Sequence, residues 1–259
     1  MRRALSVPVI LLALLAGYGT AHALDAAKAE AMTKASEQFV ALAKDSHTTG
    51  KPPRQTDAAA KPLMDRVFDL SEVQKSSSTF KMADLGNLNT WNLAVLKIGL
   101  VYILSGTGTD DLAKLTVTDE VIKRIDQNAA DFAPEMGRYF DAQVWIQIGI
   151  MDVLNGYLPT ASQSQLNQPS FKSGIEQVRG GAAQTLNGFV TSFPNAGLTD
   201  AWRRERIAVL TAAAPRAAKF LLPEQSAELR EAAIKVAADM KDPAVKTGLT
   251  AFADTLKAK

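Results

Sequence analysis

Apolar residues recur every three to four positions along almost the whole of this chain. This spacing places them on one face of an α-helix, whereas a half-buried strand would alternate apolar and polar residues. No alternating segment of convincing strand length occurs in the 259 residues. The sequence therefore predicts an all-α fold, an antiparallel helical bundle or a short helical array of roughly eight to ten helices.

Nine segments carry the helical periodicity, and most of them are bounded by proline, glycine or helix-capping residues. The predicted helices cover residues 25–45, 57–73, 82–105, 118–132, 135–157, 171–193, 199–221, 223–241 and 243–256. Pro134 is expected to end or kink the fourth helix, and Pro215 to bend the seventh, because proline has no backbone N–H to donate.

Two of these helices, residues 82–105 and 135–157, are apolar over most of their circumference. Such helices are typical of the middle of a bundle. Lys97 and several asparagines interrupt the first of them, which argues against a transmembrane span. We expect both to be central helices of an N-terminal half, residues 24–160. The Ser-, Gln- and Asn-rich stretch 159–169 leads to a C-terminal half, residues 168–259, which we expect to pack with the first as one domain.

The first 23 residues have the features of a cleavable secretory signal. Arg2 and Arg3 give a positively charged start, and residues 7–16 are apolar but too short to cross a bilayer. Ala21-His22-Ala23 has the small-x-small pattern of a cleavage site. Cleavage after Ala23 is expected to leave a periplasmic or secreted protein that is not stably inserted in a membrane.

The composition of residues 24–259 excludes several function classes. Of the 29 Lys and Arg residues, Arg2 and Arg3 leave with the signal, so 27 basic side chains balance 27 acidic ones. A neutral chain does not suggest a nucleic-acid partner. With no cysteine, and with His47 as the single histidine, this part lacks the ligands for zinc, haem or thiolate metal sites. We expect neither a metal nor a cofactor.

Five polar residues interrupt the two central helices, namely Asn87, Asn92, Asp141, Asp152 and Asn155. The last three share one arc of the second helix. Buried polar groups need partners, so the five are predicted either to bond to one another across the interior or to line a ligand cavity. The two aspartates cannot form an acid–base pair, because they are separated by about 16 Å along the helix axis.

A short motif suggests a catalytic alternative. Ser78-Thr79-Phe80-Lys81 resembles the Ser-x-x-Lys motif of serine β-lactamases and penicillin-binding proteins, and Lys246-Thr247-Gly248 resembles their third motif. The resemblance implies an acyl transferase or hydrolase acting on envelope substrates, with Ser78 as nucleophile and Lys81 helping to deprotonate it. The family's Ser-Asp-Asn motif is missing between the two segments, and Lys246 lies in a helical pattern where the family has a strand.

Three further groups have a structural interpretation beside a functional one. Asp110 and Asp111 after Gly108 suggest a calcium loop, but they lack the calcium-binding spacing and fit a loop ahead of a helix. A basic helix could bind an anion, but pairing with Glu205 and nearby acids is favoured. Its cations are Arg203, Arg204, Arg206, Arg216 and Lys219. The three tryptophans are predicted to be core anchors. They are Trp91, Trp145 and Trp202.

The leading functional prediction is a protein that acts by binding. The partner would be another protein or a small molecule held between the central helices. The acyl transferase or hydrolase that uses Ser78 and Lys81 is the alternative.

Overall fold

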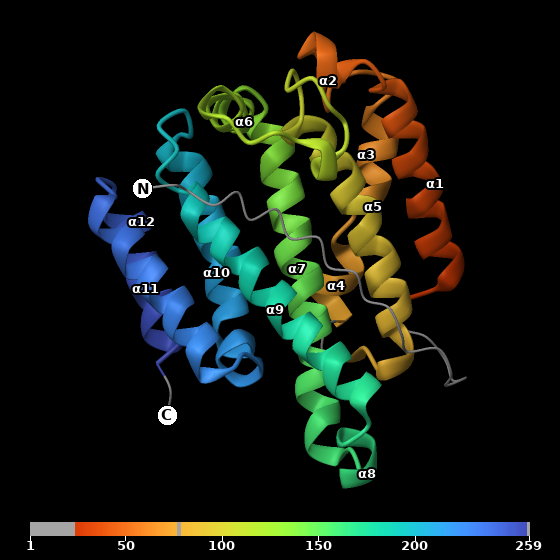
Figure 1. The fold of residues 1–259 in the computed structure, drawn as a ribbon, viewed down its shortest axis with the longest axis vertical. Coiled ribbons are helices and arrows are strands. Elements are labelled where there is room, and N and C mark those ends of the chain that lie inside the picture. Colours follow the sequence, from red (N-terminus) through yellow and green to blue (C-terminus); the bar gives the residue numbers. More distant parts are fainter. Residues whose placement is uncertain (1–23, 77–78, 258–259) are drawn as a thin grey trace.

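The computed structural model describes residues 24–76 and 79–257, and in these ranges the chain forms helices and loops without a strand (Figure 1). This part contains twelve α-helices, nine of them at least seven residues long. The all-α prediction is therefore confirmed. The expected signal, residues 1–23, lies outside the described residues.

The helices follow the predicted order. Their bounds are α1 (Ala26–Leu42), α2 (Ser46–Thr49), α3 (Lys61–Val67), α4 (Ser71–Ser76), α5 (Leu85–Ile103), α6 (Asp119–Asp131), α7 (Ala133–Tyr157), α8 (Gln163–Leu166), α9 (Pro169–Ser192), α10 (Asp200–Phe220), α11 (Pro223–Asp239) and α12 (Pro243–Thr255), with the 3₁₀ turns η2 (Met82–Asp84), η3 (Leu112–Lys114) and η4 (Leu158–Thr160).

Local sequence signals account for most helix ends. The side chains of Thr118 and Thr199 accept hydrogen bonds from the first turns of α6 and α10. Pro134 lies in the first turn of α7, where its missing N–H costs nothing. The helix α10 continues through Pro215.

One predicted helix is wrong, because residues 57–73 form two helices, α3 and α4, instead of one. A tertiary contact helps to end α3: the indole Nε1 of Trp91 donates a 2.7 Å hydrogen bond to the carbonyl of Val67. That carbonyl is among the last four of the helix, which have no partner within it. Two expected loops also contain short helices, α2 and α8.

The two helices that are apolar over most of their circumference, α5 and α7, pack against each other. Gly99 of α5 allows this approach, because a Cβ there would lie 2.3 Å from ring carbons of Tyr139. Gly149, farther along α7, faces Phe80, which precedes α5. The two helices are therefore antiparallel. The other neighbours of α5 include α1, and α7 also packs against α10.

In the described ranges, no helix is both long enough and apolar enough to cross a membrane.

Candidate functional site

The structure separates the five predicted polar residues into three places. Asp141, Asp152 and Asn155 face α10, whereas Asn87 binds the backbone before α1 and Asn92 is buried on α5. The predicted network across the interior is therefore not a single site.

Asp141 and Asp152 form two ion-pair rungs between α7 and α10. The carboxylate of Asp141 accepts bonds of 3.1 and 2.7 Å from Nε and Nη2 of Arg206. Asp152 accepts a 3.1 Å bond from Nε of Arg216, whose backbone carbonyl accepts a bond from Asn155. The partners follow the same order on both helices, so α7 and α10 run parallel. These contacts connect the helices and hold no open ligand site.

The Asp141–Arg206 ion pair is largely buried, and this burial affects the pKa of the Asp141 carboxyl group. Burial raises the pKa of Asp141 above its ordinary value, and the Arg206 guanidinium offsets part of that rise. Arg206 also pairs with Glu205 and lies 5.2 Å from the ring centroid of Trp202. A guanidinium over an indole face gains a favourable cation–π contact. Arg206 is therefore committed to partners within the chain.

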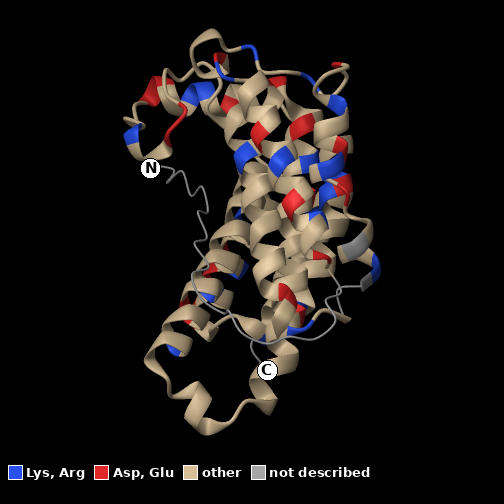
Figure 2. Cartoon of the chain, turned by 90° about the vertical axis from the view of Figure 1, so that its right-hand side faces the viewer, with Lys and Arg blue, Asp and Glu red and all other residues tan. Residues whose placement is uncertain are grey.

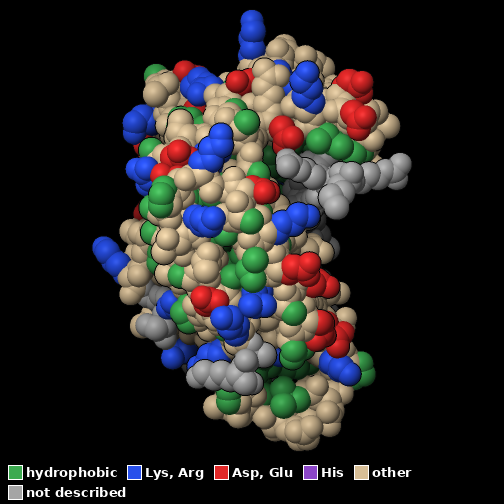
Figure 3. All heavy atoms as spheres, turned by 90° about the vertical axis from the view of Figure 1, so that its left-hand side faces the viewer, with side chains coloured by type: hydrophobic (Ala, Val, Ile, Leu, Met, Phe, Trp, Pro, Cys, Tyr) green, Lys and Arg blue, Asp and Glu red, His purple; other side chains and the backbone are tan. Residues whose placement is uncertain are grey.

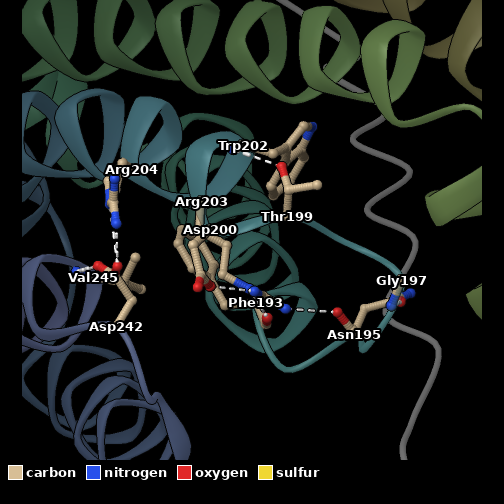
Figure 4. Close-up of polar contacts among 10 residues, drawn as sticks. All are labelled: Phe193, Asn195, Gly197, Thr199, Asp200, Trp202, Arg203, Arg204, Asp242 and Val245. Carbon is tan, nitrogen blue, oxygen red and sulfur yellow. Dashed lines mark hydrogen bonds and ion pairs between the residues drawn. The ribbon is translucent and has the colours of Figure 1, made fainter.

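The remaining arginines of the basic helix are also paired within the chain (Figure 4). Arg203 donates to the carbonyls of Phe193 and Asn195 at the end of α9. Arg204 pairs with Asp242, which caps α12, at 2.5 Å. Only the exposed Lys219 has no ion pair in the described ranges. These contacts support the intramolecular interpretation of the basic residues and leave few cations for an anionic partner.

The surface supports the same conclusion. On the face formed by α11 and α12, positive and negative side chains are interspersed with scattered apolar ones (Figure 3). Charges of both signs also lie along the side of the bundle that contains α1 (Figure 2). Neither face has a large patch of one sign that would attract a polyanion.

The two segments that resemble motifs of serine β-lactamases, residues 78–81 and 246–248, lie in different parts of the chain. Ser78 lies outside the described residues, and Lys81 immediately precedes η2, which packs against α5 and α7. Lys246-Thr247-Gly248 lies in α12, which packs against α10 and α11. Gly248 allows close helix packing there, because a Cβ on it would lie 2.2 Å from Ile207. The Lys246-Thr247-Gly248 segment therefore has a structural role in α12.

Two other predicted groups have structural roles. The carboxylate of Asp111 accepts a 2.9 Å bond from the amide of Ala113 and caps η3, as expected for a loop residue ahead of a helical turn. Trp91 and Trp202 are buried core residues, whereas Trp145 is only partly buried.

The best candidate for a binding site is a groove between α1 and α5. A hollow of about 320 Å³ lies between α1, α2 and α5, and a second of about 240 Å³ continues it along the same helices. Both hollows are lined by Lys97 and Leu100. We call the two together the α1/α5 groove. It extends along α5 from Thr90 to Leu104, which corresponds to about 21 Å of helix.

The walls of the α1/α5 groove are mainly apolar. Leu93, Leu100, Val101 and Leu104 recur at helical spacing on α5, and Val40 faces them from α1. Val40 is 39% exposed, which is unusual for a large apolar side chain in this protein. The groove therefore offers apolar surface that the described part of the chain leaves in contact with solvent.

Charged groups lie in the middle and at one end of the groove. Nζ of Lys97 lies 3.1 Å from a carboxylate oxygen of Glu37, so this ion pair connects α5 to α1. Near α2, the lining includes Lys44, His47 and Asp110. Within the described ranges, no ion pair involves Lys44 or Asp110.

The broad apolar circumference of α5 is visible in the sequence, but the position of the groove is not. That pattern predicts a helix in the middle of the bundle and does not indicate which stripe stays exposed. In the structure, neighbouring helices cover most of α5, and the stripe through Leu93 and Leu100 remains partly exposed. A ligand site between α5 and α7 is not supported, because Gly99 and Tyr139 pack closely there.

No family model matches this chain, and comparisons with curated proteins and with solved structures found no match either. A functional assignment therefore depends on the geometry of the molecule.

Proposed function

We propose that this protein works outside the cytoplasm, after removal of residues 1–23, by binding an amphipathic helix of a protein partner in the α1/α5 groove. The observation that carries the proposal is the groove itself, an apolar channel about four helical turns long. Helix-in-groove recognition is a common mode of peptide binding.

The exposure of the groove favours a helix over a small molecule. Sites for small ligands enclose about 70–90% of the ligand surface. Here Val40, Leu93 and Leu100 remain partly exposed, so an occupant would keep one side in water. An amphipathic helix has that division, with apolar residues three, four and seven positions apart on the bound side.

The charges of the groove suggest how a partner is oriented. Lys44 and Asp110 lie at the α2 end, and the Lys97–Glu37 pair lies near the middle. A polar rim around an apolar centre is typical of protein interfaces, where charges contribute more to orientation and association rate than to affinity. We expect the partner helix to carry charges of both signs at the end that meets α2.

Selection from a displayed library of helical peptides tests this proposal. Binders selected on the wild-type protein should carry apolar residues at i, i+3 or i+4, and i+7. Leu100→Asp should weaken them at least about tenfold, since it places a charge in the apolar wall. The matched control is Ile234→Asp, which changes an exposed apolar residue on α11. Circular dichroism of both variants checks that they fold.

Two results would overturn this function. The first is a set of peptides that bind wild type and Leu100→Asp equally. The second is saturable binding of the fluorescent fatty acid cis-parinaric acid, lost in Leu100→Asp, with no peptide selected; the groove would then be a site for a small amphiphile.

The acyl-transferase alternative has a separate test. A fluorescent penicillin would label an active Ser78 covalently. A binding protein should show no such label. If the wild type is labelled and Ser78→Ala is not, the binding proposal is overturned in favour of the acyl transferase or hydrolase.

A further inference from the structure

Leu24, the first described residue, is held at both ends of its backbone by side chains from the start of α5. Its amide nitrogen lies 3.2 Å from Oδ1 of Asp84, and its carbonyl accepts a 2.8 Å bond from Nδ2 of Asn87. The side chain of Leu24 is fully buried in the core, and Asp84 is fully buried as well. Leu24 is therefore anchored in the fold by both its backbone and its side chain.

This position coincides with the expected cleavage site. Hydrolysis after Ala23 consumes one water and breaks the C–N bond to Leu24. Ala23 leaves with a carboxylate, and the nitrogen of Leu24 becomes an amine that is mainly protonated at neutral pH, because an α-amino group has a pKa of about 7.7–8.0. In the intact chain, the same nitrogen is a neutral amide with a single hydrogen.

We propose that cleavage after Ala23 converts the Leu24–Asp84 hydrogen bond into an ion pair, which fastens the start of α1 to the start of α5. The agent is an endoprotease of the signal-peptidase class with water as co-reactant. The inference rests on the export and cleavage in the proposed function, and it adds that processing stabilises the site.

The geometry already fits an ion pair. The Leu24 nitrogen lies within the range in which an ammonium and a carboxylate interact directly. Oδ2 of Asp84 is oriented by a 2.8 Å bond from the amide of Lys81, and Asn87 fixes the register of Leu24. Before cleavage only the carboxylate carries a charge, and after cleavage both partners do, so a Coulomb attraction adds to the hydrogen bond. Cleavage at any other position would place the ammonium away from Asp84.

The contact also joins the two helices that form the groove. α1 begins two residues after Leu24, and α5 begins one residue after Asp84. These are the two helices whose side chains form the apolar walls. A stronger contact between their starts therefore stabilises the α1/α5 groove from one end.

Two proteins that differ by one residue test the inference. Residues 24–259 and residues 23–259 are each made as a fusion whose cleavage leaves Leu24 or Ala23 as the first residue. Both products then carry an N-terminal ammonium, and only its position differs. The product that begins at Leu24 should melt about 2–6 °C higher. In Asp84→Asn this difference should vanish, as a double-mutant cycle requires for a direct interaction. Equal melting temperatures, or a difference that persists in Asp84→Asn, would overturn the inference.

A second measurement does not depend on the folding of Asp84→Asn. The Leu24 amine of the wild-type product is labelled with ¹³C by reductive methylation and titrated by NMR. An adjacent carboxylate should raise its pKa above that of the same label on the product that begins at Ala23. An equal or lower pKa would overturn the inference.

The mass of the exported protein separates this inference from the proposed function. A chain that begins at Leu24 confirms the cleavage, and an Asp84-independent melting temperature would then reject only the ion pair. A different first residue would reject the ion pair together with the expected cleavage site. Peptide binding in the groove is decided independently by Leu100→Asp.

Discussion

Gln147, in the middle of α7, is fully buried, and in the described structure neither end of its amide has a hydrogen-bond partner. Oδ1 of Asn92 and Nε2 of Gln143 are also buried without a partner. Asn92 lies two turns before Gly99 on α5, and Gln147 lies two turns after Tyr139 on the antiparallel α7. The two amides therefore lie at about the same height along the two helices. Asn92 stands out in the sequence, but glutamine is so common on helix surfaces that its burial here could not be foreseen.

Replacing Gln147 by leucine should stabilise the protein by about 1–2 kcal/mol, because it removes buried polar atoms whose desolvation no hydrogen bond compensates. Urea denaturation measures the change in the free energy of unfolding. Gln127→Leu, at an exposed position on α6, is the control and should be nearly neutral. A loss of stability in Gln147→Leu would show that the amide has a partner that matters.

The Asp141–Arg206 ion pair should contribute more to the free energy of unfolding than an exposed ion pair. Asp141→Asn removes the charge that faces a guanidinium only 10% exposed, and we expect it to lower the free energy of unfolding by about 2 kcal/mol, because Arg206 keeps Glu205 as a partner. The control is Glu30→Gln, which breaks an exposed pair with Lys34 on α1 and should cause no measurable change. Similar effects of both substitutions on urea denaturation would contradict this assignment.

At the scale of the elements, the close packing of α5 and α7 depends on one missing side chain. Gly99→Ala should destabilise the protein by about 1–3 kcal/mol, because the new methyl group would overlap the ring of the buried Tyr139. Gly174→Ala in α9 meets no neighbour and should stabilise by up to about 1 kcal/mol. In thermal unfolding, the melting temperature should fall for Gly99→Ala and rise for Gly174→Ala. An unchanged melting temperature of Gly99→Ala would contradict the tight contact.

The start of α12 should respond to acid. The hydrogen bond from Arg204 and the amide of Val245 lower the pKa of Asp242 to about 2 (Figure 4). In the unfolded chain an aspartate has a pKa of about 3.9, so the folded state is favoured above pH 4 and loses this advantage as the pH falls towards 2. Melting temperatures across this range should fall more steeply for wild type than for Asp242→Asn. Parallel curves would contradict the role of this carboxylate.

At the scale of the whole molecule, arginines join helices by capping the ends of their neighbours. The last carbonyls of a helix lack partners within it and carry the negative end of its dipole, so a guanidinium from another element is well suited to them. Four such bonds connect Arg54 to Asp131, Arg124 to Ser105, Arg179 to Phe220 and Arg203 to Phe193, whose carbonyls lie at or just past the ends of α6, α5, α10 and α9. Several of the arginines of the chain therefore act within the fold.

The sequence by itself determined the helices and most of their ends. Periodicity and capping act between residues three or four positions apart, so they can be recognised locally in α1, α7 or α12. It also predicts that α5 and α7 are central, because a helix that is apolar on most sides favours burial on several sides. The split between α3 and α4 could not be recognised in this way, since the contact of Val67 with Trp91 comes from a distant segment.

Only the tertiary structure decided which partners the polar residues take and which apolar stripe stays open. Asp141 and Arg206 are 65 residues apart, and Leu24 and Asp84 are 60 apart. A helix that is apolar on every side does not indicate which side its neighbours will leave uncovered. The α1/α5 groove exists because the surrounding helices bury the other faces of α5, and that arrangement depends on packing between segments far apart in the chain.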